Sequence, residues 1–135
     1  MSRRIEDLHL AMQPRVRRWL AACKDAGLDI LVTCTMRTWQ EQAALYAQGR
    51  TTPGRIVTYA RPGESAHNHG LALDFVPLAH GKPQWSATHP HWAVAGELGE
   101  AAGLEWAGRW TKFREYPHLQ MPLRRTLIEE RSASA

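Results

Sequence analysis

Residues 65–78 read SAHNHGLALDFVPL, and this stretch combines a strand pattern with side chains that bind metals. Its second half, residues 71–78, alternates in the manner of a β-strand. In an extended chain, residues two apart share a face, so His67 and His69 can both point at one metal ion. Asp74 follows further along the same hairpin or strand. The stretch therefore predicts a β-element that carries a metal site.

Helices and strands are predicted on both sides of this stretch. Apolar residues at helical spacing predict helices, and runs of β-branched and apolar residues predict strands. Thr38 and Glu41 have the spacing of a helix capping box, and Gly49 follows that helix. In chain order, the predicted elements are a helix at 5–12, a helix at 14–26, a strand within 29–37, a helix at 39–48, the strand at 71–78 and a helix at 89–104. This order favours an α+β domain with helices packed on a small, mainly antiparallel sheet.

The segment from Gly49 to Gly63 is rich in glycine, proline and threonine, and contains one short apolar run at residues 56–57. We expect a long ordered loop with a small strand there, and long loops in compact domains are usually functional. The chain shows no internal repeat and no second domain. We therefore expect one domain over residues 1–130 and a disordered tail over residues 131–135.

Length and composition exclude several classes of protein. The chain has 135 residues with a formal net charge of +4, and 44% of its residues are hydrophobic, which is close to the globular average. A single core of this size folds without a metal or disulfides, so a metal site is expected to serve chemistry. No apolar run approaches the roughly 18 residues of a membrane span, and the N-terminus lacks the apolar core of a signal peptide, which predicts synthesis in the cytoplasm. Cys23 and Cys34 are too few for a disulfide framework.

The basic charge does not predict nucleic-acid binding. Arginines within 15–18 and 124–125 are dispersed and lack interleaved aromatic residues. A metal-dependent nuclease is a rival interpretation, but the literal tripeptide His67-Asn68-His69 differs from the nuclease motif of that name, whose residues are far apart in sequence. A modest basic surface suits any polyanion, including a bacterial cell wall.

A second cluster of polar residues, Glu115-Tyr-Pro-His118, lies downstream. Two neutral imidazoles and one carboxylate, with a fourth position left to water, form the kind of site that a catalytic zinc ion requires. A nearby carboxylate can accept the proton of that water, and Glu115 is the candidate. Spacing alone leaves open whether His67, His69, Asp74 and His118 bind a metal or have ordinary structural roles.

The combined motif resembles a known family signature. The pattern Ser65-x-His67-x-x-Gly70-x-Ala72-x-Asp74, followed by Glu115-x-Pro117-His118, resembles the zinc peptidoglycan peptidases. These include D-alanyl-D-alanine carboxypeptidases and L-alanyl-D-glutamate endopeptidases. The stretches 37–46, 49–58 and 103–110 are similar to the L-alanyl-D-glutamate branch, which includes many phage endolysins. The likeness extends over residues 10–121.

The resemblance implies a Hedgehog/DD-peptidase-like fold and one bound Zn²⁺ ion. It assigns the zinc to His67, Asp74 and His118, and it makes Glu115 the general base and later proton donor. His69 stands where the family has an aromatic or other non-ligand residue, and the choice between the two neighbouring imidazoles stays open here.

The resemblance also assigns residues to the substrate. Arg37 would stabilise the oxyanion or anchor a substrate carbonyl, because a guanidinium keeps its proton. Ser65 and Gln42 match positions that would bind the substrate or support the site.

The expected activity is hydrolysis of the L-alanyl-D-glutamate bond in peptidoglycan, by a monomer that acts on the cell wall after release, as an endolysin does. A D-alanyl-D-alanine carboxypeptidase on the same zinc site is the alternative. A zinc-containing wall-binding module without activity is a further one, but the presence of Glu115 and Arg37 argues against it.

Overall fold

The computed structural model describes residues 1–122, so the domain end predicted at residue 130 and the tail predicted at 131–135 lie outside the described part. Within residues 1–122, three α-helices and five strands confirm the predicted α+β class. The elements are η1 (Ile5–Asp7), α1 (Gln13–Asp25), β1 (Asp29–Cys34), α2 (Trp39–Ala47), η2 (Ala66–His69), β2 (Ala72–Ala79), β3 (Lys82–Pro83), α3 (His91–Ala101), β4 (Glu105–Trp106), η3 (Ala107–Arg109) and β5 (His118–Gln120), where η marks a 3-10 helix. None of the helices in this part is long and apolar enough to cross a membrane.

The sheet is antiparallel and is organised around β2. Its strand order is β1-β2-β5-β4, and the short β3 pairs with the far end of β2. The register places Asp74 of β2 opposite Cys34 of β1 on one side and opposite His118 of β5 on the other. Residues from three separate segments of the chain therefore meet in one row across the sheet.

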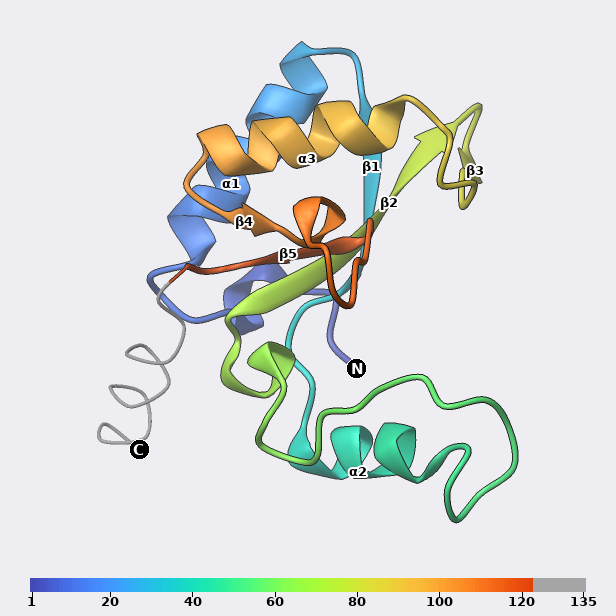
Figure 1. The fold of residues 1–135 in the computed structure, drawn as a ribbon. Helices are drawn as coiled ribbons and strands as arrows, with labels where there is room; N and C mark the ends of the chain where they lie inside the picture. The colour runs from blue at the N-terminus through green and yellow to red at the C-terminus, as the bar shows by residue number, and fades with distance from the viewer. Residues whose placement is uncertain (123–135) are drawn as a thin grey trace.

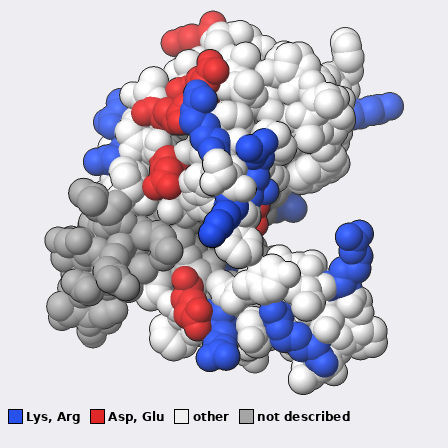
Figure 2. Space-filling model, viewed as in Figure 1, with Lys and Arg blue, Asp and Glu red and all other residues white. Residues whose placement is uncertain are grey.

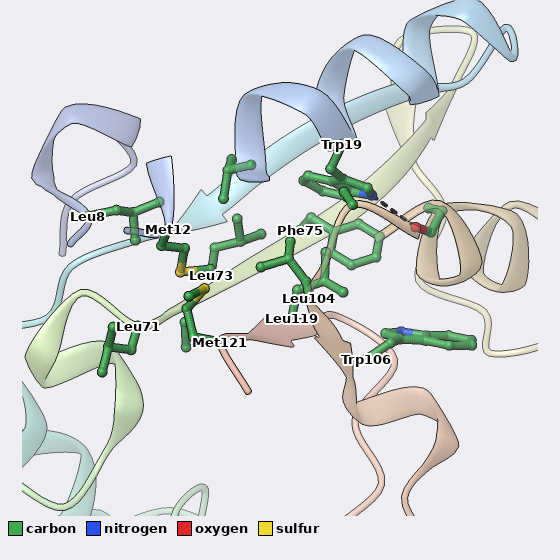
Figure 3. Packing of buried hydrophobic residues seen from close by; sticks show 14 of the residues in the cluster. Leu8, Met12, Trp19, Leu71, Leu73, Phe75, Leu104, Trp106, Leu119 and Met121 are labelled. Carbon is green, nitrogen blue, oxygen red and sulfur yellow. Dashed lines mark hydrogen bonds between the residues drawn. The ribbon is translucent and has the colours of Figure 1, made fainter. Parts of the chain in front are cut away.

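Helices α1 and α3 lie together on one side of the sheet (Figure 1). Trp19 of α1 donates from its indole nitrogen to the Ala95 carbonyl of α3 at 2.9 Å, which satisfies a polar group that is otherwise enclosed by the core. Its ring also packs edge-on against Phe75 of β2, with ring centroids 5.0 Å apart. Figure 3 shows these rings beside Leu73 and Leu119 in the centre of the core.

Helix α2 and the loop that follows it lie away from these two helices, at the other end of the molecule (Figure 1). The predicted capping box is confirmed, because the Thr38 hydroxyl accepts from the Glu41 amide and the Glu41 carboxylate accepts from the Thr38 amide. Gly49 has a φ of +80°, a conformation that favours glycine and ends the helical segment.

Two of the predicted elements are wrong. The helix expected at 5–12 is only the 3-10 turn η1, because the His9 amide donates to the Gly70 carbonyl and so leaves the helical hydrogen-bond pattern. The small strand expected at 56–57 does not form, and both residues of that run are exposed. Side chains hold the backbone of this loop instead: Gln48 donates to the Arg55 carbonyl and Arg50 donates to the Thr58 carbonyl.

Two leucines offer a matched test of the core. Leu73 is fully buried, whereas Leu10 is 81% exposed. We expect Leu73→Ala to lower the free energy of unfolding by about 2–5 kcal/mol, because it leaves a cavity beside Phe75. Leu10→Ala should change it by less than about 0.5 kcal/mol. Urea denaturation of both variants measures the difference, and equal losses would contradict this description of the core.

Candidate active site

The three side chains predicted as metal ligands meet at one carboxylate oxygen, Oδ1 of Asp74. Asp74 Oδ1 lies 3.2 Å from His67 Nε2 and 3.2 Å from His118 Nδ1. Both imidazoles are buried, and the Asp74 side chain is 26% exposed. The site is therefore enclosed on the protein side and open where the carboxylate meets solvent.

The local structure explains how these side chains are positioned. Strand β2 alternates, so Leu73 and Phe75 enter the core while Asp74 between them points to the other side. His67 precedes the strand on η2, and Gly70 makes the turn between the two elements with a φ of +68°. That left-handed conformation favours glycine, which gives Gly70 of the motif a specific structural role.

The outer nitrogen of each imidazole is held by an oxygen acceptor. His67 Nδ1 lies 2.9 Å from the Thr35 carbonyl oxygen, and His118 Nε2 lies 2.9 Å from Gln120 Oε1. A carbonyl oxygen can only accept, so each outer nitrogen carries the proton in these bonds. The inner nitrogens, which face Asp74, can then either bind a metal ion through a lone pair or, when protonated, donate to the Asp74 carboxylate. This is the arrangement by which metal-binding histidines are oriented in proteins.

Electrostatics keep the Asp74 carboxylate charged. Burial opposes its charge, but the contacts from His118 and His67 outweigh that effect and hold the pKa of Asp74 well below its usual range. Burial likewise opposes protonation of His67, yet its hydrogen bond to Asp74 raises its pKa. Arg37 Nη2 adds a positive charge 3.9 Å from Asp74 Oδ2. The carboxylate thus attracts positive charge to the space between the two rings.

This donor set fits a zinc ion. Two imidazole nitrogens and one carboxylate oxygen match the three protein ligands of a catalytic zinc site, which leaves a position for water. Cys34 is also close: its sulfur, a nitrogen of His67 and an oxygen of Asp74 all lie within 4.8 Å of one another. Thiolates are good zinc ligands, so the row Cys34–Asp74–His118 provides donors on both sides of the carboxylate.

His69 does not share the position of His67. The expectation that both imidazoles lie on one face of a strand is wrong, because residues 66–69 form the 3-10 helix η2. With three residues per turn, side chains two positions apart point in different directions. His69 Nε2 lies 2.8 Å from the Gly63 carbonyl oxygen, where the side chain joins η2 to the preceding loop.

A cavity of about 500 Å³ opens over the carboxylate and the two imidazoles. Arg37, Ser65, Trp110 and Glu115 lie in its wall, so residues from both ends of the molecule surround it. Glu115 Oε2 is 3.9 Å from His118 Nδ1, and its side chain is 57% exposed. Lys and Arg side chains lie on both the upper and the lower part of the surface in Figure 2.

Comparison with known proteins identifies the family. A family model described as D-alanyl-D-alanine carboxypeptidase, of the M15 peptidases, matches residues 58–121. The peptidoglycan L-alanyl-D-glutamate endopeptidase CwlK of Bacillus subtilis (strain 168) is 40% identical over 123 residues, which cover 85% of this chain and 74% of CwlK. The chain belongs to the M15 peptidase family. The L-alanyl-D-glutamate peptidase of Listeria phage A118 is also similar, at 34% identity over 77% of this chain, although the match covers only 34% of that enzyme.

Solved structures of M15-like proteins share the fold. The L-Ala D-Glu endopeptidase ChiX of Serratia marcescens superposes with a TM-score of 0.68 at 20% identity, covering 91% of this chain and 86% of ChiX. The D,D-pentapeptidase VanY, solved in complex with Zn(II), superposes with a TM-score of 0.65 at 15% identity over 93% of this chain and 78% of that one. The predicted fold is thereby confirmed.

Two predicted substrate residues of this M15 site have structural partners. Gln42 is fully buried behind Arg37: its Oε1 accepts from Arg37 Nη1 at 2.9 Å, and its Nε2 donates to the Ala60 carbonyl at 2.8 Å. Ser65 lies in the cavity wall and caps η2, where its hydroxyl accepts from the His67 amide at 3.3 Å. Ser65 faces the cavity, whereas Gln42 lies outside its wall.

The sequence interpretation missed Gln120 and the position of Cys34. Gln120 follows His118 by two residues in β5, so strand periodicity could have placed both on one face. The proximity of Cys34 to Asp74 depends on the pairing of β1 with β2 and has no local signal in the sequence.

Proposed function

We propose that this M15 peptidase is a zinc enzyme that hydrolyses peptidoglycan stem peptides between L-alanine and D-glutamate. The convergence of His67, Asp74 and His118 on one point of a solvent-open cavity supports it most directly. CwlK and the phage relative, which are both named for this bond, support the choice of substrate.

In this proposal His67, Asp74 and His118 hold one zinc ion, which when bound supplies a Lewis acid that lowers the pKa of a water molecule toward 7. Glu115 lies at the edge of the same cavity. Its carboxylate accepts the proton of the attacking water and then passes it to the leaving amine, since one residue can serve both steps.

Arg37 stabilises the negative charge that develops on the substrate carbonyl oxygen. Its guanidinium faces the cavity and offers a fixed positive charge there. Gln42 fixes that guanidinium from behind, and it also binds the loop at Ala60. We therefore propose that Gln42 is a positioning residue, which acts through Arg37, and that Ser65 contacts the substrate.

The named activities of the relatives favour an endopeptidase over a carboxypeptidase, because CwlK and the phage enzyme are both named for the L-alanyl-D-glutamate bond. A carboxypeptidase must in addition bind the free terminal carboxylate of its substrate. Among the described residues that line the cavity, Arg37 is the one lysine or arginine, and the proposed mechanism uses it for the oxyanion. The family model described as D-alanyl-D-alanine carboxypeptidase makes that activity the alternative to be tested.

We also propose that the enzyme acts as a monomer on the cell wall and that it serves in lysis of a bacterial host. Its similarity to a bacterial wall peptidase and to a phage peptidase supports this role.

Product analysis tests the choice of bond. We expect the zinc-loaded protein to cleave defined muropeptides between L-alanine and D-glutamate, as measured by mass spectrometry. Glu115→Gln is the control for catalysis, and it should lower kcat by about 100-fold or more, because it removes the base. Release of D-alanine alone would overturn the endopeptidase proposal and establish the alternative.

The two histidines of η2 provide a matched pair for the metal site. We expect His67→Ala to abolish zinc binding, because it removes an inner nitrogen that faces Asp74. His69→Ala should keep close to one zinc ion per chain and only weaken activity, because His69 faces Gly63. Metal analysis after dialysis measures both stoichiometries, and loss of zinc from His69→Ala with zinc retained in His67→Ala would reverse the assignment.

Gln42 and Gln40 are two glutamines on the same helix, one buried and one exposed. We expect Gln42→Ala to lower kcat about tenfold with a small change in KM and an unchanged zinc content, because Arg37 loses its partner. Gln40→Ala should leave both constants unchanged. An increase in KM alone for Gln42→Ala would instead show that Gln42 binds the substrate directly.

A further inference from the structure

A second hollow of about 300 Å³ adjoins the catalytic cavity. The two share Val57, Thr58, Ala60, Phe113 and Glu115 in their walls, so they are continuous beside the proposed general base. Apart from Glu115, none of the described side chains in the wall of this hollow takes part in the proposed mechanism or the metal site. Its position next to Glu115 places it where a part of the substrate adjacent to the scissile bond would lie.

Two exposed aromatic rings face each other in this hollow. Tyr59 belongs to the long loop after α2, and Phe113 belongs to the segment between η3 and β5. Their ring centroids are 5.8 Å apart and their planes are inclined by 53°. Tyr59 is 70% exposed and Phe113 is 72% exposed, although side chains of this type are usually buried. We define these two residues as the aromatic pair.

The protein holds the aromatic pair in place. Arg50 donates to the Thr58 carbonyl at 3.1 Å, and its guanidinium lies 3.8 Å from the Tyr46 ring centroid and 5.8 Å from that of Tyr59. These contacts fix the backbone and the ring on one side of the hollow. On the other side, Phe113 has a φ of +55°, which is unusual and costly for a bulky residue. Such strain without burial of the ring points to a binding role.

We propose that the aromatic pair is a subsite for the amino sugar that carries the stem peptide. This inference rests on the proposed function and deepens it. The amino group of L-alanine is joined through a lactyl group to the muramic acid of the glycan, so a sugar ring lies close to the bond that is cut. The stem peptide is mainly small or charged, whereas the sugar ring has a broad face of C–H groups that packs on aromatic rings. An aromatic surface beside Glu115 therefore matches the sugar better than the peptide.

One part of the peptide is the competing occupant. Arg114 also lines the hollow and provides a positive charge that the free carboxylate of D-glutamate could bind. The backbone carbonyl of Trp110 accepts from Arg114 Nε at 2.9 Å, so part of the guanidinium is already engaged. The exposed side chains of the aromatic pair, Ile56 and Val57 make the wall of the hollow largely apolar, and this favours the sugar.

A pair of substrates that differ only in the sugar tests the inference. One is a muramyl peptide, and the other is the same stem peptide with an acetyl group on L-alanine, which preserves the amide. We expect Phe113→Ala and Tyr59→Ala each to lower kcat/KM about tenfold for the muramyl peptide, chiefly through KM, and to leave the acetyl peptide unchanged. Phe113→Tyr should retain the preference. Trp85→Ala is the control, because Trp85 is 59% exposed and lies outside both hollows.

The other outcomes overturn the inference. Equal losses on both substrates would show that the aromatic pair only supports the loop, and no loss would show that it does not touch the substrate. If Arg114→Gln lowers kcat/KM equally on both substrates while Phe113→Ala has no effect, the hollow binds the D-glutamate carboxylate instead.

Binding to the Glu115→Gln variant separates failure of the subsite from failure of the proposed function. We expect the muramyl peptide to bind this variant about tenfold more tightly than the acetyl peptide, and Phe113→Ala in the same background to remove the difference. If this preference is found but the wild-type protein does not cut the L-alanyl-D-glutamate bond, the subsite stands and the proposed bond is wrong. Cleavage of that bond without any sugar preference in binding would overturn the subsite alone.

Discussion

The candidate active site depends on the pairing register of β2 with its two neighbours. Asp74 lies opposite Cys34 of β1 and opposite His118 of β5, and this register alone brings His118 to the carboxylate. Because side chains in a strand alternate, a slip of one residue would turn Asp74 into the core and Leu73 or Phe75 out of it. The burial of these two apolar residues against α1 and α3 therefore also fixes the proposed metal ligand between them. The packing of the core and the geometry of the site therefore depend on the same strand register.

A layer of buried polar groups then orients the side chains that the register has brought together. The Thr35 carbonyl and Gln120 hold the outer nitrogens of the two imidazoles, and Gln42 holds the guanidinium of Arg37. Both glutamines are buried, and a buried amide is costly unless it is hydrogen-bonded. Each therefore has little freedom to move, and each transmits that restriction to the side chain it contacts. These side chains are held in place because a shift of Gln42 or Gln120 would break the hydrogen bonds of a buried amide.

Features that depend on local physics could be predicted from the sequence. The capping box at Thr38, the helix predicted at 14–26 and the alternating strand at 71–78 each depend on nearby residues only. The proposed ligands His67, Asp74 and His118 were identified by a motif, and the structure brings these three together.

The remaining features depend on contacts between distant segments. The His9 amide donates to the Gly70 carbonyl and so takes no part in the helix expected at 5–12. The strand expected at 56–57 has no partner among the described strands. The two-residue spacing predicts that His69 lies beside His67 on a strand, whereas η2 is a 3-10 helix. The backbone of η2 is held by Asn68, whose side-chain amide donates to the Arg37 carbonyl and accepts from the Gly63 backbone amide. No pattern within residues 65–70 contains that information.

In the proposed mechanism, Arg37 adds a fixed positive charge to that of the metal. A divalent cation between His67, Asp74 and His118 would carry two positive charges, of which the Asp74 carboxylate cancels one. Glu115, in the wall of the same cavity, would offset the other until it accepts the proton of the attacking water. The positive charge uncovered by that proton transfer is opposite in sign to the oxyanion that forms, and the guanidinium of Arg37 would add a second positive charge from the protein side. A preorganised positive charge of this kind stabilises the transition state without any rearrangement at the moment of reaction. Gln42 fixes the position of the Arg37 guanidinium, so Arg37 can provide such a charge. A residue of α2 therefore supports the reaction proposed for the ligands on the sheet.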